Sequence, residues 1–515
     1  MLDLGASFFA SVGRDPDVTA IVDGGLRLTY AQWYAKISSV VAAFDALGLE
    51  GGDHIVTVLQ NRWEAATIYW ACQFTGIIIT PINWRANADE LDFCTENAEA
   101  EAVIFQQVSA EAVERSKHAR GVRRIAVGEV DKANDGAVRF DEMSDLGAPD
   151  AIPRADASAW SIMLYTSGTT SKPKGVPRRH FAERAAGIAH VAQNLYRRGE
   201  RTLGVMPLYH TMGVRSLIAM SLVGGAFVCL PRYDAKQALG IIEAEKITNL
   251  YLVPTLYHDL VHNEALAGTD ISSVRKLGFA GASMTDGLLK KLKGTFKPEL
   301  FVNHYGSSEI YTFTVDQNAV VKPGSAGKAG INQHVKVVKL NAQSVNELAA
   351  TDEEGEIIAL LAGDESFEGY WRRPDADAKA LREGWYFTGD TGYVDKDGFF
   401  FIKDRLKDMI VSGSENVYPA EIEAVLASHP DLVEVAIIGV PDRKWGESVK
   451  ACVVKREGSM LTAEGLIDWC RDKFAGYKRP RTVDFLDALP RNASGKMLKR
   501  KLREPYWEGY ERKVN

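Results

Sequence analysis

Long apolar runs, paired cysteines and an excess of basic charge are all missing from this chain of 515 residues. The five cysteines are scattered without a C-x-x-C pair, which gives no disulfide framework or zinc site and favours a reducing compartment. The formal net charge of −7 argues against a nucleic-acid-binding surface. What remains is an ordinary soluble protein, long enough for two or more domains.

Signals for export or membrane insertion are also missing. The first 16 residues lack the basic start of a signal peptide and contain Asp3. The most apolar stretch, residues 65–82, is interrupted by Gln73, Gly76 and Pro81, and it is typical of a buried helix that leads into a strand. We therefore expect a cytoplasmic protein without membrane insertion.

Helix and strand signals alternate along most of the chain. Thr29 and Gln32 form a capping-box pattern, apolar residues from Trp33 to Leu47 lie on one helical face, and residues 54–59 are typical of a strand. The alternation recurs over residues 181–230 and 235–253. It predicts an α/β fold built from doubly wound sheets.

The pattern changes after about residue 404. A turn-rich segment at 412–416 precedes a helix start at Pro419, strands at 433–440 and 448–455, and a helix at 462–474. About a hundred residues suffice for a small α+β domain. We expect a large domain over residues 1–404, a hinge at 405–409 and a small mobile domain over residues 410–515.

A loop rich in hydroxyls, glycine and lysine follows the strand-like residues 162–165. It reads Tyr165-Thr166-Ser167-Gly168-Thr169-Thr170-Ser171-Lys172-Pro173-Lys174-Gly175-Val176. Glycines allow the turns that bring N–H groups to anionic oxygens, and lysines add positive charge. Since Pro173 stands where a Walker A loop has its second glycine, the loop predicts phosphate binding of another kind. A solvated loop is the alternative.

Five further strings follow along the chain. They are residues 206–213, 279–283, 304–309, 384–390 followed by 404–408, and 489–498. Taken alone, each has a structural interpretation: a buried histidine, a tight turn, an exposed glutamate, a solvated charge run and a surface lysine.

Together and in this order, the loop and the five strings resemble the motifs of the adenylate-forming enzymes: acyl- and aryl-CoA synthetases, peptide-synthetase adenylation domains and luciferases. The resemblance covers most of the chain after Ser161. Residues 207–213, 279–286, 367–370 and 477–481 look most similar to 4-chlorobenzoate CoA ligases and their benzoate-type relatives. Ser171 and Ser414 depart from the family by standing where glycine is usual.

The resemblance implies a role for each motif. Lys496 is implied to be the lysine that stabilises the adenylation transition state, His210 an aromatic gate beside the acid, and Glu309 a ligand of Mg²⁺. Tyr305 would stack on adenine and Asp390 would hold the ribose. The implied nucleotide-binding residues are Thr166, Ser167, Gly168, Thr169, Thr170, Lys174, Gly281, Ala282, Ser283, His304, Tyr305, Gly306, Ser308, Asp390 and Arg405.

The resemblance also assigns the hinge, the thiol acceptor and the acid. Lys407 falls at the hinge position. The implied CoA-binding residues are Gly413, Ser414, Trp445, Tyr477, Lys478 and Arg479. The acid pocket would comprise His210, Thr211, Met212, Val214, Ala280 and Ser307, a mostly apolar slot for a ring or short chain. Arg215 is a candidate partner for a second carboxylate.

The implied activity is that of an AMP-forming carboxylate–CoA ligase that uses ATP, Mg²⁺ and coenzyme A on a benzoate-type or other ring or short-chain carboxylate. A medium- or long-chain fatty-acyl-CoA synthetase and a luciferase-like oxygenase are alternatives. A non-catalytic nucleotide-binding relative is an alternative from another class. The sequence leaves the acid, the pathway and the oligomeric state open, a homodimer included.

Overall fold

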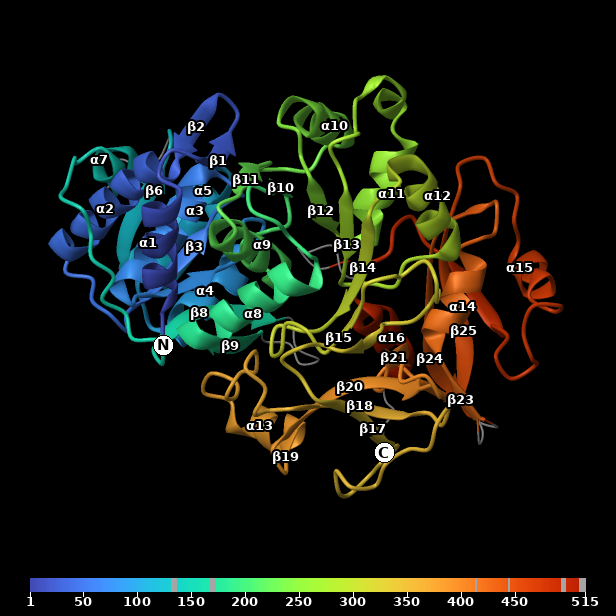
Figure 1. Cartoon of the computed structure of the whole chain (residues 1–515). Helices are drawn as coiled ribbons and strands as arrows, with labels where there is room; N and C mark the ends of the chain where they lie inside the picture. Colours follow the sequence, from blue (N-terminus) through green and yellow to red (C-terminus); the bar gives the residue numbers. More distant parts are fainter. Residues whose placement is uncertain (131–136, 167–172, 413–414, 443–444, 492–496, 509–515) are drawn as a thin grey trace. The chain divides into compact units, whose positions relative to one another are not determined.

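The computed structural model describes residues 1–130, 137–166, 173–412, 415–442, 445–491 and 497–508 (Figure 1). The chain divides into a first unit, residues 1–335 with 359–386, and a second unit, residues 336–358 with 387–515. It passes between them within β17 (Val335–Lys339), β18 (Gly355–Leu360) and β20 (Trp385–Val394). The expected domain limits and the hinge at 405–409 differ from this division and stay predictions.

The first unit contains a seven-stranded sheet whose strands are parallel except at one edge. There β8 pairs antiparallel with β9, and Thr166 lies opposite Lys174, so both ends of the expected phosphate loop are paired. In order across the sheet, the strands are β7 (Val138–Arg139), β6 (Arg123–Val127), β5 (Ala100–Gln106), β3 (His54–Val58), β4 (Ile78–Pro81), β8 (Trp160–Thr166) and β9 (Lys174–Arg179).

A nine-stranded sheet forms the rest of the first unit's β-structure. Its neighbouring strands β10 to β14 pair in parallel, whereas β2, β15 and β16 pair antiparallel. The order is β16 (Lys328–Ala329), β15 (Thr314–Asp316), β14 (Leu300–Tyr305), β13 (Lys276–Phe279), β12 (Asn249–Leu252), β10 (Arg201–Gly204), β11 (Ala226–Cys229), β1 (Thr19–Asp23) and β2 (Leu26–Thr29).

Helices cover both sheets of the first unit. α8 packs on β8 and β9, α9 packs on β10 and β11, and the two helices contact each other, so they lie between the sheets (Figure 1). The helices are α1 (Leu4–Arg14), α2 (Tyr30–Ala46), α3 (Trp63–Thr75), α4 (Ala88–Ala98), α5 (Gln107–Arg115), α6 (Lys117–Gly121), α7 (Phe140–Ser144), α8 (His180–Gln193), α9 (Thr211–Leu222), α10 (Ala235–Ala244), α11 (Pro254–His262), the 3₁₀ helix η1 (Glu264–Gly268), α12 (Asp286–Phe296) and α13 (Pro374–Ala380). A short strand, β19 (Leu381–Arg382), pairs with β20.

Local sequence signals agree with several of these elements. Thr29 caps α2, and the reciprocal bonds with Gln32 complete the capping box. The apolar stretch at 65–82 is the buried α3 followed by β4, as expected. Pro254 follows β12 and is also the first residue of α11, a position that needs no N–H donor. The expected α/β fold class is confirmed.

The second unit contains a sheet in the order β23-β22-β25-β24, with β26 beside β25. The helix expected at 462–474 is shorter and ends at Trp469, because the main-chain hydrogen bonds after Cys470 mix three- and four-residue spans instead of continuing the helical pattern. The elements are β21 (Phe400–Arg405), β22 (Ile410–Ser412), β23 (Glu415–Val417), α14 (Pro419–Leu426), β24 (Leu432–Asp442), β25 (Gly446–Lys455), α15 (Ala463–Trp469), β26 (Thr482–Phe485) and α16 (Lys499–Trp507).

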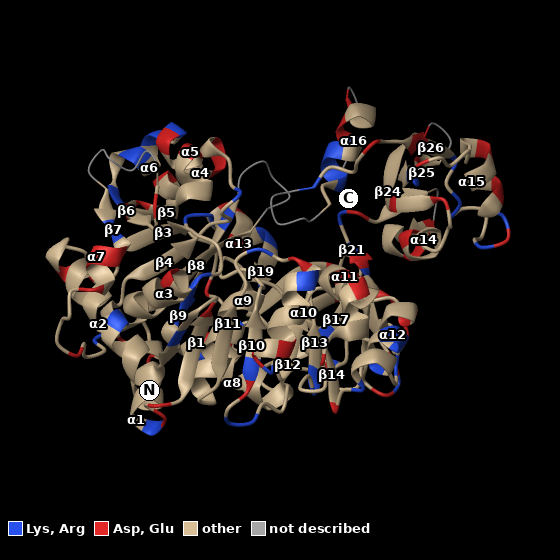
Figure 2. Cartoon of the chain, turned by 90° about the horizontal axis from the view of Figure 1, so that it is seen from above, with Lys and Arg blue, Asp and Glu red and all other residues tan. Residues whose placement is uncertain are grey.

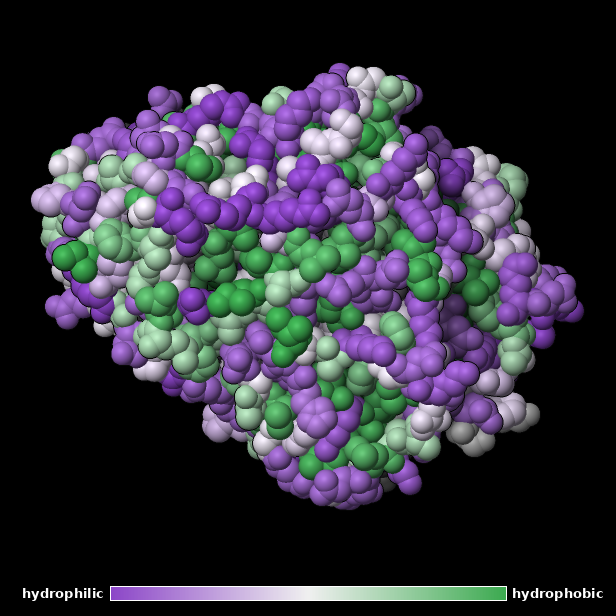
Figure 3. All heavy atoms as spheres, viewed as in Figure 1, coloured by the Kyte–Doolittle hydropathy of each residue, from purple (hydrophilic) through white to green (hydrophobic). Residues whose placement is uncertain are grey.

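Charges of both signs are distributed over each unit (Figure 2), and the face in Figure 3 mixes hydrophilic and hydrophobic residues. Within the ranges given above, no helix has the length and apolarity needed to cross a bilayer. All five cysteines are free and buried, as expected for small apolar side chains.

Candidate functional site

Several sequence-predicted residues of the first unit lie where parallel strands of the nine-stranded sheet end. His210 follows β10, Gly281 follows β13, and Tyr305 is the last residue of β14. Because β10, β12, β13 and β14 pair in parallel, their carboxyl ends share one edge of the sheet. Ligands of open α/β sheets bind at such edges, so this edge is the candidate site.

His210 is the N-cap residue of α9 at this edge and is half-buried. Its Nδ1 accepts a 3.3 Å hydrogen bond from the main-chain N–H of Met212. An acceptor at Nδ1 places the proton of a neutral imidazole on Nε2. The ring orientation is therefore set by the helix start, and the role of His210 as a gate stays a prediction.

The segment after β14 makes a turn that requires glycine. A Cβ on Gly306 would lie 2.1 Å from the carbonyl oxygen of Tyr311, a separation that no larger residue tolerates. The half-buried Tyr305 lies beside Phe313, with ring centroids 5.0 Å apart. The turn therefore fixes the main-chain path from Tyr305 to Glu309.

Glu309, Tyr370 and Lys174 come together from three segments. The Tyr370 hydroxyl donates a 2.7 Å hydrogen bond to Oε1 of the buried Glu309. The Lys174 ammonium nitrogen lies 3.8 Å from the centroid of the Tyr370 ring. Burial, and to a lesser extent the negative charge of Glu309, raise the pKa of Tyr370. The hydroxyl therefore stays protonated and can donate. Burial lowers the pKa of Lys174, while Glu309 acts against that shift.

The side chains around Glu309 offer one carboxylate to a cation, which suits a cation that takes most of its ligands from phosphate and water oxygens. Among the described residues, no group of three or more His, Cys, Asp or Glu side chains could hold a metal ion. Mg²⁺ commonly uses one or two carboxylates together with phosphate and water oxygens. A single buried carboxylate beside a lysine is therefore compatible with Mg²⁺ bound to a polyphosphate.

Three other predicted residues point into the protein interior. His304 is 2% exposed, and its Nε2 contacts Asn194 Oδ1 at 3.2 Å, which makes Nε2 the donor. Burial lowers the pKa of His304 well below its usual range. Met212 and Val214 are 1% and 0% exposed and pack in two different hydrophobic cores. Roles for these side chains in binding stay predictions.

Arg215, the candidate partner for a second carboxylate, is 2% exposed and held by internal groups. Its guanidinium donates to Thr312 Oγ1 at 2.6 Å, to the Tyr311 carbonyl at 3.3 Å and to the Tyr251 hydroxyl. These contacts favour a structural role for Arg215.

In the second unit, the predicted ribose carboxylate and its arginine form a pair. Asp390 on β20 lies opposite Arg405 on β21 in the strand register. Arg405 Nε is 2.7 Å from Asp390 Oδ1, and its Nη1 donates to the Thr388 carbonyl at 3.2 Å. The antiparallel pairing brings together two residues that are 15 positions apart in the sequence.

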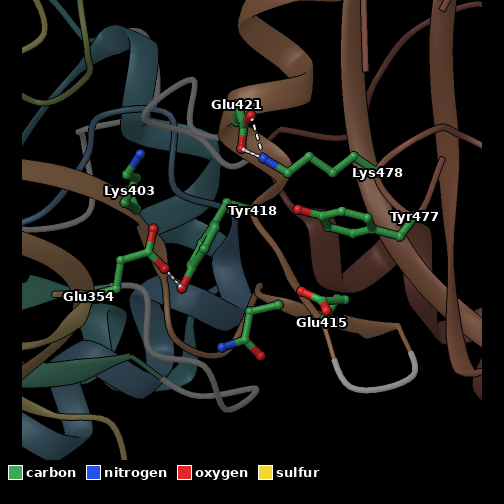
Figure 4. Close-up of a pocket in the computed structure, with 8 residues that line it drawn as sticks. Glu354, Lys403, Glu415, Tyr418, Glu421, Tyr477 and Lys478 are labelled. Carbon is green, nitrogen blue, oxygen red and sulfur yellow. Dashed lines mark hydrogen bonds and ion pairs between the residues drawn. The ribbon is translucent and has the colours of Figure 1, made fainter. Parts of the chain in front are cut away.

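A cavity of about 360 Å³ in the second unit includes two of the predicted CoA-binding residues, Tyr477 and Lys478 (Figure 4). The Lys478 ammonium is 2.7 and 2.8 Å from the carboxylate oxygens of Glu421. Burial alone would lower the pKa of Lys478, but Glu421 raises it. The other lining residues, which the CoA prediction did not include, are Glu354, Lys403, Glu415, Asn416 and Tyr418.

Other predicted CoA-binding and hinge residues have separate contacts. Arg479 donates to the Phe474 carbonyl at 2.8 Å, and the Trp445 ring lies 5.1 Å from the Arg481 guanidinium. The Lys407 carbonyl accepts a 3.1 Å bond from Arg503. The predicted residues outside the described ranges are Ser167, Gly168, Thr169, Thr170, Ser171, Gly413, Ser414 and Lys496.

Comparisons with known proteins cover nearly the whole chain. Residues 8–371 match the AMP-binding enzyme family, and residues 421–496 match the AMP-binding enzyme C-terminal domain. The chain is 33% identical over 494 residues to a feruloyl-CoA synthase of an Amycolatopsis species, covering 95% of this chain and 96% of the relative. It is 31% identical over 484 residues to a long-chain-fatty-acid–CoA ligase of Mycobacterium tuberculosis, covering 93% of each. It is also similar to the structure of O-succinylbenzoate coenzyme A synthetase from Bacillus subtilis in complex with ATP and magnesium ion, with a TM-score of 0.85, 26% identity and coverage of 96% and 98%.

Proposed function

Because this chain belongs to the family of AMP-binding enzymes, we propose that it is an AMP-forming carboxylate–CoA ligase. A carboxylate oxygen attacks the α-phosphorus of ATP, the bond to pyrophosphate breaks, and an acyl-adenylate forms. The thiolate of coenzyme A then attacks the acyl carbonyl, forms the thioester and releases AMP. The observation that carries this proposal is the grouping of Lys174, Glu309 and Tyr370 beside the end of β14.

The residues of the first unit have distinct tasks in the first half-reaction. Glu309 holds Mg²⁺, with its carboxylate oriented by Tyr370. When bound, Mg²⁺ neutralises charge on the phosphates. Lys174 contributes an ammonium to the same phosphates, and Tyr305 supplies a ring for adenine. His210 separates the nucleotide from the acid and presents its Nε2 proton.

The second unit supplies the ribose site, the catalytic lysine and the thiol acceptor site. Asp390, oriented by Arg405, accepts hydrogen bonds from the ribose hydroxyls. Lys496 stabilises negative charge on the α-phosphate in the adenylation transition state. Tyr477 and Lys478 hold coenzyme A at the cavity of Figure 4. Rotation about Lys407 exchanges one half-reaction for the other.

The proposed acid is a benzoate-type or other ring or short-chain carboxylate. One relative, at 33% identity, is a feruloyl-CoA synthase, which supports an aromatic acid. A ring also fills a short apolar slot without the rotor entropy that a long chain loses on binding. A fatty-acyl-CoA synthetase is the second candidate, because another relative, at 31% identity, is a long-chain-fatty-acid–CoA ligase.

The test is acid-dependent pyrophosphate release, followed by thioester formation after CoA is added. The panel is benzoate, 4-chlorobenzoate, cyclohexanecarboxylate, hexanoate, palmitate and malonate, compared by kcat/KM. We expect the benzoates to be used best. A preference for palmitate would select the second candidate. ATP binding without pyrophosphate release on a wider range of acids would indicate a non-catalytic relative, and light emission or oxygen consumption a luciferase-like one. The cytoplasmic location and the homodimer stay predictions from the sequence.

A further inference from the structure

A fully buried ion pair lies next to the segment that carries Glu309. Arg178 on β9 and Glu183 on α8 are five residues apart, and both side chains are 0% exposed. Tyr311 contacts both members of the pair: its hydroxyl donates to Glu183 Oε2 at 3.1 Å, and its ring centroid lies 3.8 Å from the Arg178 guanidinium carbon. The carboxylate and the ring together fix the plane of the guanidinium.

The fixed guanidinium also bonds to the main chain of the predicted cation ligand. Arg178 Nη1 donates to the carbonyl oxygen of Glu309 at 3.0 Å and contacts that of Ser308 at 3.4 Å. The main-chain N–H of Phe367 donates to the same Glu309 carbonyl at 2.9 Å. Glu309 is therefore held at its main chain by Arg178 and Phe367, and at its carboxylate by Tyr370.

Stability alone gives a weak reason for this ion pair. Removing two charges from water is costly, and replacing a buried ion pair by apolar residues of similar volume is often neutral or stabilising. A guanidinium has one property that an apolar side chain lacks here, since its planar fork can bond to a carboxylate and to main-chain carbonyls at once. Arg178 uses this fork to bond to Glu183 and, at the same time, to contact the carbonyls of Ser308 and Glu309.

Direct contact of Arg178 with a ligand is excluded by its burial. A side chain that is 0% exposed presents no donor to a phosphate or a substrate carboxylate. Arg179, the next residue, differs in this respect: its side chain is 25% exposed and pairs with Glu368. Arg178 can act on a bound nucleotide only through the segment that it holds.

We propose that Arg178 is a positioning residue that, through the carbonyls of Ser308 and Glu309, holds the Glu309 carboxylate in the orientation that binds the Mg²⁺ of MgATP. Glu183 and Tyr311 hold Arg178 in turn. The inference rests on the proposed function, because it requires Glu309 to be a cation ligand.

The decisive variant replaces the whole buried network with apolar groups of similar size: Arg178→Met, Glu183→Leu and Tyr311→Phe together. This triple variant removes both charges of the buried pair together, and it leaves no unbonded Tyr311 hydroxyl. The matched control is Arg179→Met with Glu368→Leu, which removes the neighbouring ion pair but no contact to Ser308 or Glu309. Glu309→Gln serves as the reference for loss of the ligand itself.

Two measurements are made on each full-length protein. Binding of the preformed Mn²⁺–ATP complex in the absence of acid is measured by calorimetry, and pyrophosphate release with benzoate is titrated with Mg²⁺. In the triple variant we expect the half-saturating metal concentration to rise about 10-fold, the lower end of outer-shell effects on metal sites. The kcat at saturating Mg²⁺ should fall less, and the control variant should match the wild type.

The outcomes separate this inference from the proposed function. If the triple variant folds and binds Mn²⁺–ATP like the wild type, Arg178 does not position Glu309. If Glu309→Gln also binds Mn²⁺–ATP normally, Glu309 is not the ligand and the inference is overturned, while acid-dependent pyrophosphate release would keep the proposed function. If the wild type releases no pyrophosphate with any acid, the proposed function itself fails.

Should the triple variant not fold, Arg178→Lys gives the test, because a point charge cannot reproduce the planar fork. We then expect about a threefold rise in half-saturating Mn²⁺–ATP, and an unchanged value overturns the inference.

Discussion

The Tyr370 hydroxyl donates to Glu309 across a sequence separation of 61 residues, at a distance of 2.7 Å. In this bond, a neutral hydroxyl donor orients a buried carboxylate. The phenol ring also faces the Lys174 ammonium, so one residue contacts both an anion and a cation of the candidate site.

Removing that hydroxyl tests the arrangement. In Tyr370→Phe we expect the affinity for MgATP to fall about 10-fold, because a hydrogen bond to a charged group contributes about 1.5–3 kcal/mol. The measurement is Kd for MgATP by calorimetry. Tyr386→Phe is the control, since its hydroxyl lies 3.5 Å from that of Tyr370. Equal affinities in Tyr370→Phe and wild type would contradict the role.

Lys496→Ala should slow acyl-adenylate formation by about two to three orders of magnitude, since the role proposed for the lysine is to stabilise charge in that transition state. CoA transfer from supplied acyl-adenylate should stay near the wild-type rate, because the proposed role of Lys496 is confined to the first step. Single-turnover kinetics of each half-reaction give both rates. An equal loss in both steps would remove Lys496 from this role.

Lys407→Pro tests the hinge. Proline fixes φ near roughly −65° and should favour one orientation of the mobile part of the chain, so one half-reaction should slow selectively. The same single-turnover measurements apply. Wild-type rates in both half-reactions would show that rotation does not occur at this residue.

Lys478→Met tests the cavity of the second unit. We expect KM for CoA to rise about two- to fivefold, the effect of a partly screened charge, while pyrophosphate release stays unchanged. Arg471→Met removes a more exposed cation that pairs with Asp468 and serves as control. Equal rises in the two variants would indicate a general charge effect.

His54 provides a pH-dependent stability test. Burial first, and then Arg372, lower its pKa from 6.5 to about 4. Because the unfolded chain takes up a proton at higher pH than the folded one, stability is complete above pH 6.5 and falls as the pH drops towards about 4. The loss approaches about 1.4 kcal/mol per pH unit.

The measurement is the thermal unfolding midpoint of wild type and His54→Asn between pH 4 and 8. Asparagine keeps a polar group near Thr80, which contacts His54 Nδ1 at 3.0 Å, but it does not titrate. The variant should therefore lose less Tm than the wild type on acidification. Parallel curves would show that His54 does not couple protonation to folding.

The sequence by itself determined the α/β class, the start of α2 at its capping box and the family. These features follow from local spacing: a cap, a helical period, or a motif contained within a dozen residues. The pairing of Asp390 with Arg405 also agrees with their shared predicted role, because two antiparallel strands bring them together.

Only the tertiary structure decided which charges are buried and what holds them. Arg178, Glu183 and Arg215 have no local sequence feature that separates them from surface charges, yet all three are at most 2% exposed. Their partners Tyr311, Thr312 and Tyr251 come from segments far away in the chain. The burial of a charge is set by the elements packed over it, and the pattern around a residue carries no information on those elements. For that reason the sequence predicted a role for Glu309, and the folded chain showed that Tyr370 bonds to its carboxylate and Arg178 to its main chain.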